Sequence, residues 1–266
     1  MSAVLHQLFP FSEQERQADA IANAVMGMLD NQGPVTMEVP GLSANDIAAA
    51  FEGLKNFELK PRDEQARWQV YEPRDPKYVE DDDGAIRKKP PDDWKLFFHY
   101  RRDLRRLLLA RNGVRLTSEE VRWFEHMDAI YRTCTAANHA LAVALDRLCP
   151  GYHCVERALQ FESTNVLRIL RYVLHPGTLA KWHTDRAGIT FHIAESHPGL
   201  RTARGHHERD ERTPATPNVL VFPGDQLDTV TRGEIERCWH TVVDTTGGTE
   251  ARQAMVFFGK FYPGTL

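Results

Sequence analysis

Apolar residues recur at helical spacing in the first half of the chain. Ile21, Val25, Met28 and Leu29 recur so as to share one face of a helix, which predicts an amphipathic helix over residues 12–30. The same spacing predicts a helix that begins after Ser43 and two longer helices over residues 93–111 and 117–149.

From residue 166 onward the pattern changes to short runs that are rich in β-branched and aromatic residues. Turn residues separate these runs, so each is predicted to be a strand. The predicted strands are 166–174, 189–193, 218–222, 240–244 and 254–262, and an earlier strand is predicted at 35–39.

Helices followed by short strands predict an α+β fold whose C-terminal part is an antiparallel sandwich or barrel. The sequence shows no internal repeat and no low-complexity segment. We therefore expect a single domain over residues 1–266. In it, a mostly helical region at 1–165 supports a core at 166–264, with the helices packed on one face of the sheet.

A polar segment interrupts the helical half at residues 60–93. It contains several prolines and the acidic run Glu80–Asp83, whose like charges repel one another and resist packing. The segment is interpreted as a solvated loop. A substrate lid is the alternative, because long loops in compact domains are often functional.

Composition narrows the class of protein. The 266 residues include 33 basic and 37 acidic side chains, a formal net charge of −4 that lacks the basic excess typical of nucleic-acid binding. No run of 18 apolar residues predicts a membrane span, and the N-terminus does not resemble a secretory signal. The four cysteines show no C-x-x-C spacing, which favours a reducing, cytoplasmic location. No pattern indicates an oligomeric state.

The candidate chemistry begins at His183 and Asp185. Residues i and i+2 of an extended chain point to the same side, so an imidazole and a carboxylate can meet at one point. Such pairs are common, and this one gains weight from His240, which lies in a later strand-like run. Two histidines and one carboxylate match the facial triad that leaves three positions of an octahedral iron open. A closed tetrahedral set would suit structural zinc instead.

Other histidines are not expected to bind the metal. His206 and His207 lie in the arginine- and acid-rich segment 201–217, which is interpreted as a solvated insertion. His192 stands among apolar strand residues and is interpreted as a core or pocket histidine.

Arg252 follows His240 across an apparent hairpin turn at residues 244–249. If the loop is centred on Gly248, Arg252 faces residue 244, on the side of His240 and roughly 13 Å along the strand. Its guanidinium could then bind a carboxylate of a short dicarboxylic acid held at the metal. A loop of even length would turn Arg252 to the other face of the sheet.

These residues belong to an ordered series of segments. The segments are LRILRY (167–172), HTD (183–185), GITFHI (188–193), PGL (198–200), FPGDQLDTVTRGEIERCWHTVV (222–243) and EARQAMVFFGKFYPG (250–264). In this order and spacing, residues 167–261 resemble the core of the 2-oxoglutarate- and Fe(II)-dependent dioxygenases, specifically the isopenicillin N synthase-like branch.

The resemblance implies a double-stranded β-helix, or jelly roll, with His183, Asp185 and His240 as iron ligands. It implies that Arg252 binds the distal carboxylate of 2-oxoglutarate and that Tyr172 donates a hydroxyl to the co-substrate or the substrate. The usual R-x-S motif is here Arg252-Gln253-Ala254, so the serine hydroxyl is missing.

Arg168 shares strand parity with Tyr172 and could pair with a substrate carboxylate; the alternative is an ion pair at the barrel edge. No catalytic residue beyond the metal ligands is predicted.

The function implied is oxidation of a small molecule, most commonly hydroxylation, with O2 and 2-oxoglutarate consumed and succinate and CO2 released. Desaturation and ring closure are related outcomes. Retention of Asp185 disfavours the related halogenases. Two alternatives stay open: an iron oxidase of the same fold that uses O2 without 2-oxoglutarate, and a non-catalytic metal- or ligand-binding module.

Overall fold

The structure is a computed structural model that describes residues 11–30, 33–70, 83–88, 95–204 and 207–262. Its helices are α2 (Phe11–Leu29), α3 (Ala44–Glu58), α4 (Arg62–Ala66), α5 (Leu104–Asn112), α6 (Ser118–Leu148), α7 (Cys154–Gln160) and α8 (Asp225–Val230), with 3-10 turns at Pro150–Tyr152 and Glu162–Thr164. Its strands are β1 (Val35–Glu38), β2 (Gln69–Val70), β3 (Asp83–Lys88), β4 (Lys95–Tyr100), β5 (Val166–Tyr172), β6 (Thr178–His183), β7 (Ile189–Glu195), β8 (Leu200–Arg204), β9 (His207–Asp210), β10 (Asn218–Pro223), β11 (Trp239–Val243) and β12 (Gln253–Gly259).

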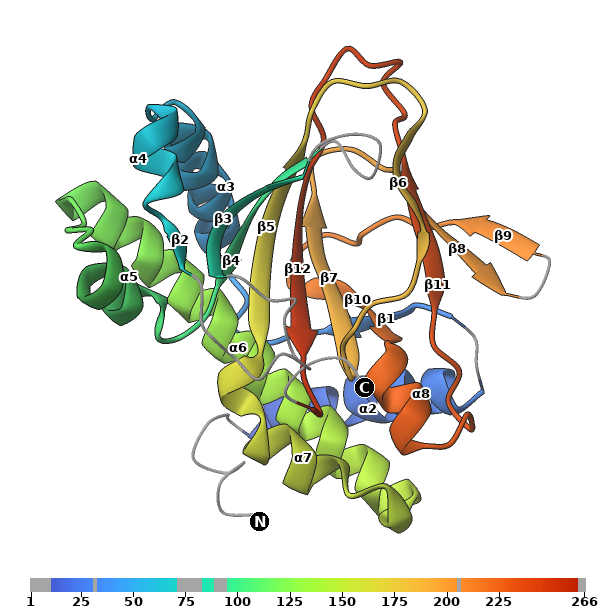
Figure 1. Cartoon of the computed structure of the whole chain (residues 1–266). Coiled ribbons are helices and arrows are strands. Elements are labelled where there is room, and N and C mark those ends of the chain that lie inside the picture. Colours follow the sequence, from blue (N-terminus) through green and yellow to red (C-terminus); the bar gives the residue numbers. More distant parts are fainter. Residues whose placement is uncertain (1–10, 31–32, 71–82, 89–94, 205–206, 263–266) are drawn as a thin grey trace.

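The strands form two antiparallel sheets. The larger sheet has the order β1-β10-β7-β12-β5-β4-β3-β2, and the smaller sheet has the order β6-β11-β8-β9. Figure 1 shows β6 and β11 of the smaller sheet facing β5, β12 and β7 of the larger one, while α3, α5 and α6 lie on the outer side of the larger sheet. The predicted α+β fold with a double-stranded β-helix core and helices on one face is confirmed.

Both faces of the central strands are buried, which explains why their sequences are nearly continuous apolar runs. On β5, Leu167 and Ile169 are fully buried against the helices, whereas Val166, Leu170 and Tyr172 are buried in a second cluster between the sheets. A strand buried on both faces needs apolar side chains at nearly every position. Each large apolar side chain so buried stabilises the fold by about 1.5–3 kcal/mol.

Two helix starts are fixed as the sequence predicts. The hydroxyl of Ser43 accepts a hydrogen bond from the Asp46 backbone N–H, at 3.3 Å, ahead of α3. Thr117 and Glu120 form a reciprocal capping box at the start of α6. Caps of this kind contribute about 1 kcal/mol each. They fix where the helices that support the larger sheet begin.

The predicted helix over residues 93–111 is wrong in its first half. Residues 95–100 form β4, which pairs with β3 on one side and β5 on the other, and only 104–112 is helical. All six residues of β4 are buried. A short segment that is buried on both faces has no polar face to reveal its period, so it cannot be distinguished from a buried helix by pattern alone.

The two predicted loops also contain regular structure. Within residues 60–93 lie α4, β2 and β3, while 71–82 and 89–94, and with them most of the acidic run, are outside the described residues. The segment 201–217 carries a hairpin of β8 and β9 that extends the smaller sheet, and His206 lies outside the described residues. The strand β6 is not among the predicted strands.

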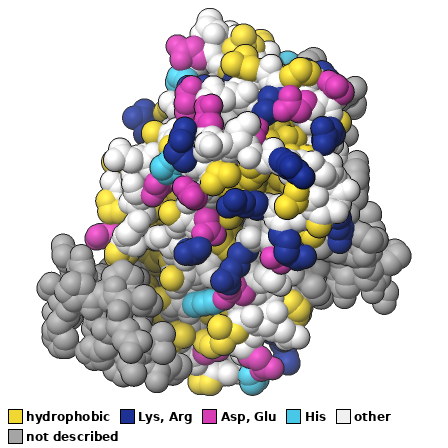
Figure 2. Space-filling view, turned by 90° about the vertical axis from the view of Figure 1, so that its left-hand side faces the viewer, with side chains coloured by type: hydrophobic (Ala, Val, Ile, Leu, Met, Phe, Trp, Pro, Cys, Tyr) yellow, Lys and Arg dark blue, Asp and Glu magenta, His cyan; other side chains and the backbone are white. Residues whose placement is uncertain are grey.

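None of the helices in the described part of the chain is both long and apolar enough to cross a membrane. Figure 2 shows the face on the side of α3, α4 and α5, where basic side chains across the middle are interspersed with acidic and hydrophobic ones.

Candidate metal centre

A pocket opens between the two sheets, with walls from both. It is lined by Lys95, Arg168, Leu170, Tyr172, His183, Asp185, His192, Leu200, Phe222, His240, Val242, Arg252, Ala254, Val256 and Phe258. The polar members of this set include every residue that the sequence singles out as a metal, co-substrate or substrate ligand. The fold therefore brings together predicted site residues that are up to 84 positions apart in the chain, from Arg168 to Arg252.

The smaller sheet supplies the three predicted metal ligands. His183 ends β6 and pairs directly with His240 on β11, and Asp185 follows β6 by two residues. One potential ligand atom from each residue lies within 4.8 Å of the other two, and the Nε2 of His240 is 3.7 Å from the Oδ1 of Asp185. Among the described residues, this is the group of His, Cys, Asp and Glu side chains that is arranged to hold a metal ion.

Hydrogen bonds orient each of these side chains. The Nδ1 of His183 lies 2.6 Å from the Lys181 carbonyl oxygen, and the Nδ1 of His240 lies 3.2 Å from the Cys238 carbonyl oxygen. Because a carbonyl only accepts, each Nδ1 carries the proton and each Nε2 keeps its lone pair for a metal. The hydroxyl of Thr190 donates to the Oδ2 of Asp185 at 2.9 Å. The donor set therefore fits a divalent iron with open coordination positions.

The electrostatics of the triad agree with ligand roles. Burial and the neighbouring His240 lower the pKa of His183, which keeps its imidazole neutral near pH 7. Burial raises the pKa of Asp185, but the charges of His240, His183 and Arg168 outweigh that effect and hold the pKa below its usual value. These shifts favour a neutral imidazole at His183 and an ionised carboxylate at Asp185.

Arg252 reaches the same pocket by a route that differs from the predicted hairpin. The strands β11 and β12 do not pair: β11 lies between β6 and β8, and β12 lies between β5 and β7 of the opposite sheet. The predicted register through Gly248 is therefore wrong. Arg252 nevertheless lines the pocket because the connection crosses from one sheet to the other, so that the inner faces of β11 and β12 look at each other.

Tyr172 lies beside Arg252 across the larger sheet. The Tyr172 backbone N–H donates to the Arg252 carbonyl oxygen at 2.8 Å, and the Cζ of Arg252 is 5.7 Å from the centre of the Tyr172 ring. Both side chains are buried. The two residues that the resemblance assigns to 2-oxoglutarate thus occupy one end of the pocket together.

Two residues that the sequence analysis missed hold or accompany this pair. The Nη2 of Arg252 donates to the Oε2 of Glu195 at 2.5 Å, and its Nε donates to the His197 carbonyl oxygen at 3.0 Å. Lys95, on β4, lines the pocket on the other side of Tyr172. Glu195 lies beyond a register shift in the pairing of β7 with β12, so the alternation of β7 does not predict the side that it faces. Lys95 lies in a segment predicted to be helical, where no signal points to it.

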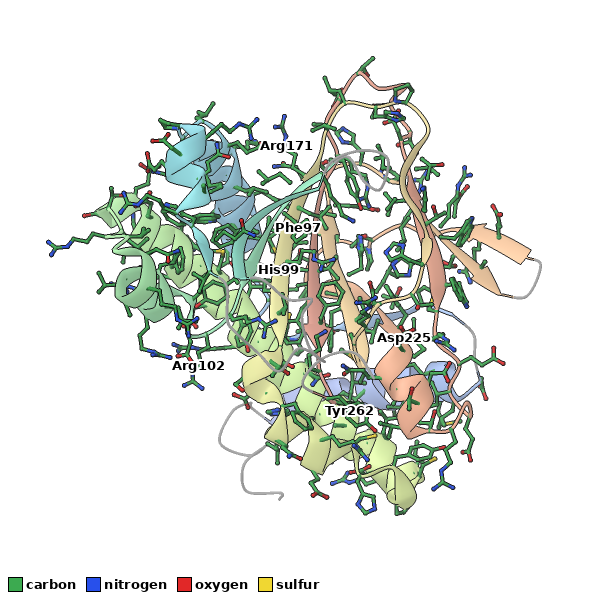
Figure 3. The ribbon with its side chains drawn as sticks, in the orientation of Figure 1. Phe97, His99, Arg102, Arg171, Asp225 and Tyr262 are labelled. Carbon is green, nitrogen blue, oxygen red and sulfur yellow. The ribbon has the colours of Figure 1, made fainter. Side chains whose placement is uncertain are left out.

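Arg168 points into the pocket, as its strand parity predicts. Its Nε donates to the Nε2 of His99 on β4 at 2.8 Å, and its guanidinium stacks over the rings of Phe97 and Phe258. Figure 3 shows Phe97 and His99 along β4, and it shows Arg171 on the side of α3, where that arginine pairs with Glu58. Arg168 and Arg171 of β5 therefore lie on opposite faces of the larger sheet.

His192 lines the pocket but is separate from the three ligand residues. Its Nδ1 is 2.7 Å from the Thr213 hydroxyl, and burial together with the charges of Arg252 and His240 lowers its pKa to about 3. It is a neutral pocket histidine, in agreement with its interpretation from the sequence.

Comparisons with known proteins identify the family. Residues 162–260 match the family model of the 2OG-Fe(II) oxygenase superfamily. This match places residues 162–260, the segment that carries His183, Asp185, His240 and Arg252, in that superfamily. The isopenicillin N synthase-like branch is consistent with it. A search of curated protein sequences finds no match.

Solved structures share the fold at low sequence identity. A full-length Neurospora crassa protein, crystallised with alpha-KG and 5-formyluracil, has a TM-score of 0.66 at 18% identity, over 91% of this chain and 78% of that one. A Caulobacter crescentus protein has a TM-score of 0.68 at 21% identity, over 96% and 88%. The 2-oxoglutarate complex of the Arabidopsis thaliana dioxygenase for auxin oxidation has a TM-score of 0.66 at 14% identity, over 89% and 87%.

The predicted class of enzyme is confirmed at the level of the superfamily: an oxidoreductase of the 2OG-Fe(II) oxygenases that uses iron, 2-oxoglutarate and O2. The roles of individual residues are not assigned by the comparisons and stay predictions.

Proposed function

We propose that this 2OG-Fe(II) oxygenase hydroxylates a small-molecule substrate in the pocket between its two sheets. His183, Asp185 and His240 bind the iron, while Arg252 and Tyr172 bind the distal carboxylate of 2-oxoglutarate. Arg168 faces the substrate from the other end of the inner row of β5. The observation that carries the proposal is the convergence of the three ligand atoms within 4.8 Å, opposite a buried arginine in the same pocket.

The chemistry that the iron supplies when bound is activation of O2, coupled to oxidative decarboxylation of 2-oxoglutarate to succinate and CO2. The protein contributes orientation. Carbonyl groups fix both imidazoles, Thr190 fixes one oxygen of Asp185, and Glu195 fixes the guanidinium of Arg252. The apolar walls, which include Phe222 and Val242, limit the access of water to the reacting groups.

We also propose that the substrate is not a nucleic acid and that the protein works in the cytoplasm. The net charge of −4 and the mixed charges of the face in Figure 2 support the first point. The four cysteines, all of them free thiols, support the second.

The decisive experiment measures succinate formed from added 2-oxoglutarate by the iron-loaded protein, across a panel of amino acids and natural-product intermediates. We expect one class of compound to stimulate succinate formation. Substrate oxidation that needs O2 but not 2-oxoglutarate would instead support the oxidase alternative.

Metal binding separates the enzyme from a non-catalytic module. Under anaerobic conditions, Fe(II) and 2-oxoglutarate should together give the weak visible charge-transfer band of a chelated complex. H183A should lose both the band and turnover. H126A is the matched control, because His126 pairs with Asp46 away from the pocket. Full activity of H183A would refute the ligand assignment, and failure of the wild type to retain iron would favour the module.

A further inference from the structure

A row of three polar residues crosses the inner face of the larger sheet at one end of the pocket. Tyr172 on β5 is the register partner of Lys95 on β4, and on its other side its backbone N–H bonds to Arg252, which directly precedes β12. All three side chains line the pocket, and they are 8%, 4% and 2% exposed for Lys95, Tyr172 and Arg252. Adjacent strands lie about 4.8 Å apart, so this row is compact.

The phenol ring stands between two cations. The Nζ of Lys95 is 5.9 Å from the centre of the Tyr172 ring, and the Cζ of Arg252 is 5.7 Å from the same point. The lysine charge also reaches the metal end of the pocket, where it contributes to lowering the pKa of His183. Lys95 is therefore directed into the site and not toward the surface of the sheet.

The charge of Arg252 is already balanced by the protein. Its guanidinium is bonded to the Glu195 carboxylate, and both side chains are almost completely buried, at 2% and 6% exposure. An incoming carboxylate at this position therefore meets an arginine whose positive charge is offset by Glu195. A second cation is needed if the bound carboxylate is to be neutralised, because burying an uncompensated charge is costly.

The pocket also lacks a hydrogen-bond donor at Ala254, in the next row of residues across the sheet. Ala254, which pairs with Leu170, lines the pocket where the R-x-S pattern of the related enzymes would place a serine hydroxyl. The site thus has one hydroxyl fewer and one cation more than the sequence resemblance leads one to expect.

The structure assigns Lys95 as a second binding residue for the distal carboxylate of 2-oxoglutarate. Its ammonium group supplies positive charge, because the charge of Arg252 is offset by Glu195. It also supplies a hydrogen-bond donor in place of the hydroxyl that Ala254 lacks. This inference rests on the proposed use of 2-oxoglutarate. It adds a binding residue from β4, a strand that lies outside the segment matched by the family.

The test compares two ligands that differ only at the distal end. Binding of 2-oxoglutarate and of 2-oxopentanoate, whose distal group is a methyl, is titrated anaerobically into the Fe(II) protein through the charge-transfer band. We expect K95M to bind 2-oxoglutarate about 10- to 100-fold more weakly, as for loss of a hydrogen bond to a charged group, and to bind 2-oxopentanoate like the wild type. K55M is the control, because Lys55 is exposed on α3 and pairs with Glu52.

A rescue variant keeps the inference testable if K95M is poorly folded or 2-oxopentanoate binds too weakly to measure. K95R should retain most of the affinity, and adding A254S to K95M should restore about 2- to 10-fold by returning a neutral hydroxyl donor. An unchanged affinity of K95M for 2-oxoglutarate, or an equal loss for both ligands, would overturn the assignment and leave Lys95 to the substrate or to the fold. If the wild type gives no 2-oxoglutarate complex at all, the proposed function itself has failed.

Discussion

Arg252, which lines the pocket, forms an ion pair with Glu195, with the Nη2 of the arginine 2.5 Å from the Oε2 of the glutamate and both side chains almost completely buried. The backbone N–H of Thr213 donates to the other oxygen of Glu195, at 3.1 Å. The arginine predicted to bind the co-substrate is therefore held in place, and its charge offset, before any ligand arrives. Breaking such a buried pair leaves one charge without its partner.

We expect E195A to destabilise the ligand-free protein by about 3–5 kcal/mol, because the guanidinium of Arg252 would stay buried without its counterion. The double variant R252A/E195A should lose clearly less than the sum of the two single variants, because it removes both charges. Urea unfolding at pH 7 measures these differences. E52Q, a change at an exposed glutamate of α3, should leave stability within about 0.5 kcal/mol of the wild type. Additive losses in the double variant would show that the pair is not energetically coupled.

Thr190 offers a test of how the iron ligands are supported. Its buried hydroxyl donates to the oxygen of Asp185 that does not face His240, so it fixes the orientation of the carboxylate. We expect T190V to lower Fe(II) affinity about 10- to 100-fold with little change in fold, as for other residues that orient a metal ligand. Anaerobic titration of Fe(II) measures this. T229V is the control, because the hydroxyl of Thr229 bonds to the carbonyl of Asp225 within its own helix. Equal Fe(II) affinities of T190V and the wild type would show that Thr190 does not support the metal centre.

The pocket could be predicted from the sequence largely because its ligands follow strand parity. His183 and Asp185 lie two residues apart at the end of a strand, and the inner row of β5 carries Arg168 and Tyr172 at even spacing. Which face of a strand a side chain points to depends only on the local extended conformation, so it can be predicted without knowing which strands pair. For this reason, these pocket residues could be predicted from the sequence.

The pairing of strands was not accessible in the same way. The turn around Gly248 predicts a hairpin, but the chain instead crosses between sheets, and β12, which follows Arg252, pairs with β5 and β7, strands that are distant in sequence. Lys95 was missed because the apolar run that follows it on β4 is buried on both faces and carries no polar period. Glu195 was missed because a single acidic residue at a strand end gives no hint that its partner is 57 residues further on.

His192 predicts a specific dependence of stability on pH. Its folded pKa of about 3 lies below the ordinary value of 6.5, so the neutral form is favoured by folding. The unfolded chain takes up a proton here below pH 6.5 and the folded chain does not. The contribution of His192 is therefore fully present above pH 6.5 and is lost as the pH falls toward 3.

We expect the metal-free wild type to lose about 2 kcal/mol more stability between pH 7 and pH 5 than H192Q, which lacks the titrating group. Urea unfolding at the two pH values, each protein compared with itself at pH 7, measures the difference. Parallel losses in the two proteins would mean that His192 is protonated as readily in the folded chain as in the unfolded one.

The loop that carries Asp185 lies so close to Gly224 that there is no room for a side chain at position 224. A Cβ at this position would lie 2.4 Å from the Ala187 carbonyl oxygen and 2.7 Å from that of Asp185. The backbone of Gly224 is in an ordinary extended conformation, with φ −102° and ψ −175°, so the constraint is contact and not torsional strain. The next backbone N–H, that of Asp225, donates to the Asp185 carbonyl at 2.9 Å, which ties the loop to the start of α8.

We therefore expect G224A to push Asp185 away from the two histidines, to destabilise the fold by about 1–3 kcal/mol, and to weaken Fe(II) binding. Thermal unfolding of the metal-free protein and anaerobic Fe(II) titration measure the two effects separately. G151A is the matched control, because a Cβ at Gly151 would meet no atom within 4 Å. A loss of stability without any loss of iron affinity would show that the loop gives way elsewhere and that the carboxylate of Asp185 is positioned by Thr190 alone.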